Sequence, residues 1–160
     1  MSTLQFERTV RPSVLDRLIE DPDGPRTVTW DASVAQFKAA VMRDLQWLLN
    51  TRRVHPMPPK ELELVRQSVY AFGIRDLSSR SADSSNVRSD LLREIQEAIA
   101  TFEPRLTKVH VSLISEGRGG PIRFNIEAEL RTDPTPEAVR FETTLDVASK
   151  AVVVSEGADA

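Results

Sequence analysis

Pro104 divides the chain into two halves with different hydrophobic periodicities. Proline has no backbone N–H and disfavours the α conformation at the residue before it, so a helix that reaches Glu103 must end there. Apolar residues recur every three or four positions before Pro104 and every second position after it. We therefore predict a stiff corner between a helix and a strand, with the charges of Glu103 and Arg105 held on either side of the proline.

The half before the corner has a helical pattern over residues 12–103, preceded by an irregular arm over residues 1–11. In the clearest segment, Val34, Phe37 and Val41 recur at helical spacing. Clusters of Pro, Gly, Asp and Ser separate the segments, and Gly73 is placed for a left-handed cap. The expected helices are a short one after Ser13, a long one with Ser33 as N-cap, a third over Lys60–Ala71 and a fourth from Asn86 to Glu103.

The half after the corner alternates apolar and polar residues over 105–154, and a frayed tail is expected at 155–160. Strict alternation is typical of strands that bury one face and expose the other to solvent. Turn residues at Gly117–Gly120 and Thr132–Pro136 separate the runs, which indicates an antiparallel meander. Residues 1–160 are thus expected to form one α+β domain, with N-terminal helices packed on one face of a small C-terminal antiparallel β-meander.

Composition argues against several functional classes. The chain of 160 residues is 40% hydrophobic and 28% charged with a net charge of −3, so it has no overall positive field for nucleic acid or an anionic membrane. It has no cysteine, and its histidines, His55 and His110, are not spaced as metal ligands. Neither a leader-like N-terminus nor a membrane-length apolar run is present. We expect a cytoplasmic protein without cofactor, metal, nucleic acid or direct membrane insertion.

A glycan hydrolase of lysozyme type is the main catalytic alternative, because Glu103 is a candidate general acid. That chemistry needs a second carboxylate at a defined separation and aromatic residues that stack on saccharide. Aromatic residues make up only 6% of the chain, and no second carboxylate is fixed beside the corner. Arg105 also favours the ionised form of a neighbouring acid. A non-catalytic function is favoured, with hydrolysis by Glu103 as the alternative.

Several separated segments occur in an order that is similar to one known family. They are Ser13–Leu18, Arg43–Arg53, Tyr70–Leu77, Phe102–Leu106 and Val139–Thr143. Together they resemble TssE, the baseplate wedge protein of type VI secretion systems, and the related contractile-phage baseplate protein, over about residues 12–154. Phe72-Gly-Ile-Arg departs from the Tyr-Gly-Leu-Pro expected of the family.

This resemblance implies assembly rather than catalysis. Members of the family lie in each wedge of a sixfold baseplate, one copy per wedge, beside the subunits TssF and TssG. Their sheet resembles the strand-exchange module of the sheath subunits TssB and TssC, and can therefore template sheath assembly. The family signature carries over onto Glu103, Pro104 and Arg105, which are expected to bind a partner. If they do, alanine at Glu103 or Arg105 should leave thermal stability nearly unchanged.

Further partner-binding candidates lie after the second helix and on the polar face of the sheet. The strand expected over Val139–Val147 is long, regular and free of proline, and only a short strand is expected after it. Such an edge normally invites pairing with another chain, so we expect it to accept a partner strand. The remaining candidates are Asn50, Arg52, Arg53, Arg140, Glu142 and Thr144.

Overall fold

The computed structural model describes residues 14–19, 29–53, 55–75, 85–116, 121–133, 135–146, 149 and 151–157. The helices are α1 (Val14–Ile19), α2 (Trp30–Asn50), α3 (Glu63–Arg66), the 3₁₀ helix η1 (Val69–Ala71) and α4 (Ser85–Phe102). The strands are β1 (Arg52–Arg53), β2 (Ile74–Arg75), β3 (Leu106–Glu116), β4 (Ile122–Leu130), β5 (Glu137–Leu145) and β6 (Val152–Glu156). This order of elements confirms the α+β prediction.

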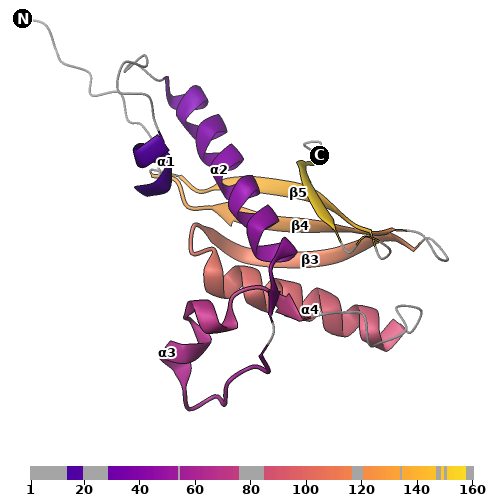
Figure 1. Ribbon diagram of the computed structural model, residues 1–160. Helices are drawn as coiled ribbons and strands as arrows, with labels where there is room; N and C mark the ends of the chain where they lie inside the picture. Colours follow the sequence, from indigo (N-terminus) through magenta and orange to yellow (C-terminus); the bar gives the residue numbers. More distant parts are fainter. Residues whose placement is uncertain are drawn as a thin grey trace, which may run out of the picture.

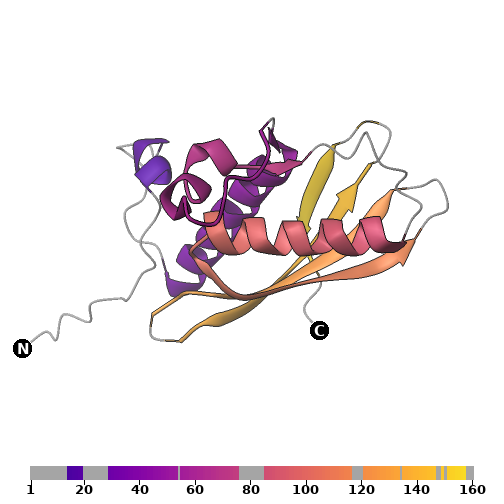
Figure 2. The same ribbon diagram turned by 90° about the horizontal axis from the view of Figure 1, so that it is seen from below.

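Strands β3 to β6 form one antiparallel sheet in sequential order. Helices α2 and α4 pack against one face of it, α2 mainly over β6 and α4 mainly over β3 (Figures 1 and 2). Alternate residues of the central strands, such as Phe124, Ile126 and Phe141, are fully buried beneath the helices together with Leu45 and Ile95. The core therefore lies between one helical layer and the apolar face of the meander, as predicted.

The N-cap of helix α2 lies four residues before the predicted one, Ser33. The cap is Thr29, which has an extended backbone and a side chain that accepts a hydrogen bond from the Ala32 N–H at 3.4 Å. Ser33 is buried inside the first turn, where its hydroxyl donates to the Trp30 carbonyl at 2.7 Å. Both threonine and serine suit a cap, and the local pattern favoured the wrong one.

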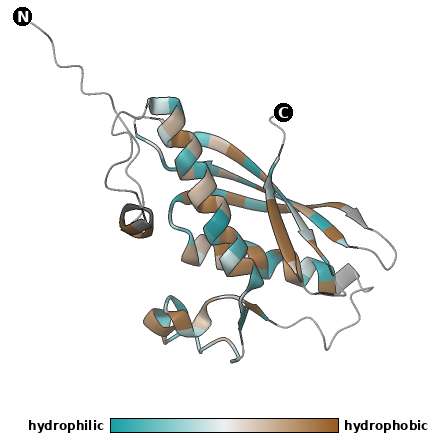
Figure 3. Cartoon of the chain, turned by 45° about the horizontal axis from the view of Figure 1, so that its top comes forward, coloured by the Kyte–Doolittle hydropathy of each residue, from teal (hydrophilic) through white to brown (hydrophobic). Residues whose placement is uncertain are grey.

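The third helix is much shorter than the prediction over Lys60–Ala71. The chain forms one α-turn, α3, and then the 3₁₀ turn η1. Ser68 breaks the helix between them: its backbone is extended and its side chain accepts from the Tyr70 N–H at 3.3 Å. Leu64 and Val69 are consequently 83% and 90% exposed, and Figure 3 shows hydrophobic colouring on this segment at its lower left.

A short parallel pair, β1 with β2, was not predicted. Ile74 donates its N–H to the Thr51 carbonyl at 3.0 Å, which fastens the end of α2 to the chain that returns from η1. Gly73 has a φ of +97°, as its predicted left-handed cap requires. A Cβ built on Gly73 would lie 2.4 Å from the Thr51 carbonyl oxygen, so only glycine permits this close approach.

Strand β3 contains a bulge that the alternation pattern did not reveal. Its register with β4 shifts between Thr107 and His110, and Lys108 has a φ of +52°. Leu106 before the bulge and Val111 after it are both buried, although their positions differ by five, an odd number that would put them on opposite faces of a regular strand. The extra residue keeps the apolar side chains of both segments on the same face of the sheet.

The prediction that the strand over Val139–Val147 is an open edge was wrong. Strand β5 pairs with β4 along its whole length and with β6 from Phe141 to Leu145. The prediction of a frayed tail over 155–160 was also wrong at its start, because Ser155 and Glu156 belong to β6. The predicted arm over 1–11, residues 158–160 of the tail, the loop before α4 and the turn at 117–120 lie outside the described residues.

Proline at either Thr143 or Thr144 should destabilise the protein. The Gly157 N–H bonds to the Arg140 carbonyl at 2.9 Å, so even-numbered residues of β5 face β6 and odd-numbered residues face β4. Each proline removes one N–H from a ladder and should cost about 1–3 kcal/mol of unfolding free energy in urea denaturation. Thr144→Ala keeps the N–H and serves as the control. A Thr144→Pro variant as stable as Thr144→Ala would contradict the pairing of β5 with β6.

Candidate functional site

The predicted corner lies between α4 and β3. The Glu103 N–H donates to the Ile99 carbonyl at 2.8 Å as the last bond of the helix, and the Leu106 N–H donates to the Glu103 carbonyl at 3.1 Å across the turn. Pro104 lies between these bonds and is exposed. Backbone hydrogen bonds on both sides of Pro104 fix this reversal of the chain. The side chains of Glu103 and Arg105 therefore have fixed directions.

Arg105 connects the corner to helix α2. Its Nε donates to Glu103 Oε1 at 2.6 Å and its Nη2 donates to Glu103 Oε2, which makes a bidentate pair. The same Nη2 also contacts Asp44 Oδ2 at 2.5 Å. Glu103 is only 4% exposed, so its carboxylate is buried and is neutralised by a cation from two residues away. Arg43 extends the cluster by donating from its Nε to Asp44 Oδ1 at 3.0 Å.

The environment of Arg105 favours its charged form. Burial alone lowers the pKa of Arg105, but the hydrogen bonds and negative charges of Glu103, and then of Asp44, outweigh burial and raise this pKa above its usual value. The guanidinium also lies over the Phe37 ring, 5.7 Å from its centroid. Arg105 is therefore a permanent cation held by two carboxylates and an aromatic face.

An apolar groove opens beside this cluster, and we call it the corner groove. It has a volume of about 440 Å³ and lies between α1, α2 and the corner. Trp47 is 51% exposed at its rim, with the Arg43 guanidinium 5.1 Å from the centroid of its ring. Its lining consists mostly of Leu15, Trp47, Phe72, Phe102 and Pro104, with Asp44, Glu103 and Arg105 at one side. The corner groove thus combines apolar side chains with one charged edge.

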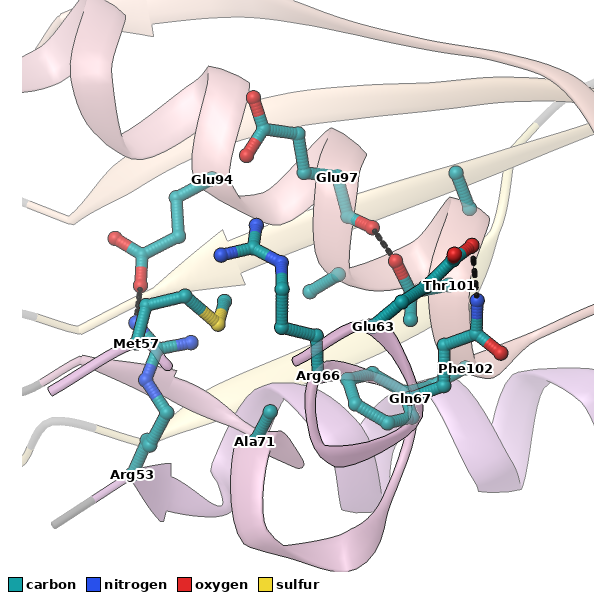
Figure 4. A pocket seen from close by; sticks show the side chains of 12 residues that line it. Arg53, Met57, Glu63, Arg66, Gln67, Ala71, Glu94, Glu97, Thr101 and Phe102 are labelled. Atoms are coloured by element: carbon teal, nitrogen blue, oxygen red, sulfur yellow. Dashed lines mark hydrogen bonds and ion pairs between the residues drawn. The ribbon is translucent and has the colours of Figure 1, made fainter. Parts of the chain in front are cut away.

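A second hollow, of about 460 Å³, lies between the α3–η1 segment and α4. Figure 4 shows the Arg53–Glu94 ion pair at one end and the Gln67–Glu63 hydrogen bond at the other, with Arg66 extending toward α4 between them. Arg66 donates to the Pro58 carbonyl at 2.8 Å. Of these interactions, the Arg53–Glu94 pair joins β1 to α4, whereas the other two lie within residues 58–67.

Two of the residues predicted near the end of α2, Arg52 and Arg53, lie in β1 and not beside the corner. Arg53 Nη2 pairs with Glu94 at 2.8 Å, and Glu94 also binds Arg75. Arg52 is partly buried in β1. Asn50 reaches the other side of the molecule, where its Nδ2 donates to the Val152 carbonyl at 2.8 Å and its Oδ1 accepts from the Val152 N–H at 2.9 Å.

The predicted sheet residues share the face that the helices leave uncovered. Glu142 is exposed there, and Arg140 and Thr144 are partly exposed on either side of it. Arg140 Nε lies 4.0 Å from Glu127 on the neighbouring strand. The nine predicted residues therefore fall into three places: the corner, the end of α2 and the outer face of β5.

Sequence reasoning missed Asp44 and Trp47. Both lie on α2 at the border of its apolar stripe, and Asp44 is 61 residues from the arginine that it binds. Only the packing of α2 against the corner brings them together.

Within the described ranges, no group of three or more His, Asp or Glu side chains is placed to hold a metal ion. No helix among those residues is both long and apolar enough to cross a membrane.

Arg105→Ala should destabilise the protein strongly, contrary to the expectation from the sequence. The change leaves the Glu103 carboxylate buried without its cation, which typically costs about 3–5 kcal/mol. Urea denaturation of Arg105→Ala beside Arg93→Ala, whose side chain is mostly exposed, provides the measurement and its control. Equal stability of the two variants would show that the corner does not depend on this pair.

Comparison with known families agrees with the resemblance found in the sequence. The family model for baseplate wedge protein gp25 matches residues 35–135, which is more than half of the chain and includes most of α2, the corner and strands β3 and β4. No curated protein matches significantly. The chain therefore belongs to the gp25 family of baseplate wedge proteins and has a structural role in a baseplate.

Proposed function

We propose that this protein is a non-catalytic subunit of a type VI secretion baseplate wedge, one copy per wedge of a sixfold assembly in the cytoplasm. Membership of the baseplate wedge family and the TssE-like motifs support this assignment. The observation that carries it is the corner, where the family signature folds into a rigid, charge-locked turn beside an exposed apolar groove. Rigidity and exposed apolar area suit docking of another protein.

The corner groove is the proposed docking surface for TssF and TssG. Trp47 is half exposed at its rim, and Val14 and Leu18 of the adjacent α1 are more than 70% exposed. Exposed tryptophan with neighbouring aliphatic residues is typical of binding hot spots. The buried Glu103–Arg105 pair sets the shape of this surface, and exposed Pro104 contributes contact area. In this proposal, Glu103, Pro104 and Arg105 act mainly by fixing the conformation of the docking surface.

Trp47→Ala should reduce co-purification with TssF–TssG while leaving the fold intact. Truncation of an exposed aromatic anchor typically costs about 2 kcal/mol or more of binding, and little core packing is lost because half of the ring faces solvent. Pull-down from cells and thermal melting measure the two effects. Gln46→Ala, at the adjacent exposed position of α2, is the control. Unchanged co-purification by Trp47→Ala would exclude the groove as this interface.

The structure gives little support to the hydrolase alternative. Both carboxylate oxygens of Glu103 already accept from the Arg105 guanidinium, so neither is directed at a substrate oxygen. Asp44 also binds Arg105, so both carboxylates at this side of the corner groove are paired with the same cation. The lining of the corner groove is mostly apolar, which suits a protein contact better than a glycan.

Purified protein should release no soluble fragments from peptidoglycan. The expected result is a rate equal to that of buffer for the wild type and for Glu103→Gln, measured beside a lysozyme control. A wild-type rate above background that Glu103→Gln abolishes would reinstate the hydrolase alternative.

We also propose that the sheet templates the sheath built from TssB and TssC. Its exposed face carries Arg140, Glu142 and Thr144, and its outer strands offer backbone groups to a further strand. Asn50, Arg52 and Arg53 then serve docking indirectly, because they fasten α2 to neighbouring elements. The arrangement at the two edges decides which of them can accept a strand.

A further inference from the structure

Helix α1 is held weakly against the rest of the protein. It has only six residues, fewer than an isolated helix needs to be stable in water. Among the described residues, no other helix or strand packs extensively against it. Figures 2 and 3 show α1 on the outside of the helical layer, apart from the sheet. The position of α1 therefore depends on a few side-chain contacts.

Leu15 makes the contact that places α1 at the corner groove. It belongs to the lining of the groove, together with Trp47, Leu48 and Phe102 from the other elements. Leu15 is 38% exposed, about half the exposure of the other aliphatic residues described in this helix. In the free protein, part of the wall of the corner groove is therefore a leucine from a helix that has little other support.

The larger apolar face of α1 is directed into solvent. Val14 and Leu18 are four positions apart and so lie on one face of the helix. They are 73% and 78% exposed, whereas a helix that docks permanently buries its apolar stripe. Helix α1 thus contacts the groove through Leu15 and leaves its other aliphatic side chains in water. A contact made by one side chain of a marginal helix is easily exchanged for another.

Leu15 fills only part of the corner groove. The space beside it is about 440 Å³, a volume in the range of sites that bind a complete small ligand. A partner that fills this space competes with Leu15 for the same apolar surface. Because the chain tethers α1 to α2, Leu15 competes as an intramolecular ligand, whose effective concentration does not fall on dilution.

We infer that α1 is a displaceable cover of the corner groove. In the free subunit Leu15 shields part of the apolar surface from water, and on docking a partner side chain takes its place while α1 moves outward. The exchange rests on the proposed docking of TssF and TssG at this groove, and it makes α1 a regulator of that site. Because one partly exposed leucine holds the cover closed, its removal can change affinity by no more than about tenfold.

Fluorescence of the free protein tests the resting position of α1. The chain has no cysteine, so Leu18→Cys accepts a bimane label at a single exposed position. Tryptophan quenches bimane at short range, and Trp47 lines the same groove as Leu15. Emission should be at least twofold lower than in the same labelled protein with Trp47→Phe, and adding Leu15→Asp should remove this difference. Quenching that persists in Leu15→Asp, or that is absent from the start, would overturn the cover.

Affinity for the TssF–TssG complex tests the exchange. Leu15→Asp should bind about three- to tenfold more tightly than the wild type, because a carboxylate is excluded from the apolar groove and leaves it open. Leu64→Asp makes the same change at a leucine that is 83% exposed and does not line the groove, so its affinity should be that of the wild type. Weaker binding by Leu15→Asp would show that α1 is a fixed wall of the interface, and unchanged binding would also contradict the exchange.

Bimane emission in the complex separates the exchange from the docking itself. When TssF–TssG binds the labelled Leu18→Cys protein, displacement of α1 should raise emission to the level of the free Trp47→Phe variant. Binding with unchanged emission would overturn the exchange and keep the docking role. Absence of any binding would overturn the docking role and with it the exchange. Leu15 lies outside the hydrophobic core, so Leu15→Asp should melt as the wild type does.

Discussion

The Arg105 guanidinium is the contact on which the corner and the helical layer both depend. It neutralises a buried carboxylate on its own turn and reaches Asp44 on α2, so a local reversal of the chain is coupled to a helix 61 residues away. Replacing such a cluster with apolar residues often costs nothing, whereas removing one partner is expensive. The pair therefore holds the corner in one geometry beside the groove that we propose as a docking surface.

Two side-chain amides bind outward backbone groups at the two opposite edges of the sheet. Gln96 from α4 binds the β3 edge and Asn50 from α2 binds the β6 edge, so each helix supplies the cap for the strand that it covers. An open sheet edge promotes aggregation, and small domains usually protect it with charges or proline. Here the two helices protect backbone groups of the outer strands directly, through these side-chain amides.

The sequence predicted the fold class, the corner and the order of the strands, because periodicity and proline act locally. The prediction failed where the local sequence allows two alternatives. Thr29 rather than Ser33 is the cap of α2, and Ser68 interrupts the helix predicted over Lys60–Ala71. The sequence analysis did not predict the β3 bulge, although the apolar residues move from even to odd positions between Leu106 and Val109. Long-range partners were beyond reach, since neither Asp44 with Arg105 nor Asn50 with Val152 leaves a trace in a single sequence.

The contact between Asn50 and Val152 has a consequence for synthesis in the cell, because 102 residues separate them. The strands of the sheet pair with their sequence neighbours and need only short loops to close. Helix α2, in contrast, cannot contact β6 until the residues between them have been translated, which takes about 5–20 s at ordinary elongation rates. During that interval the part of its apolar stripe that packs over β6 lacks its partner strand, so this part of the core forms last.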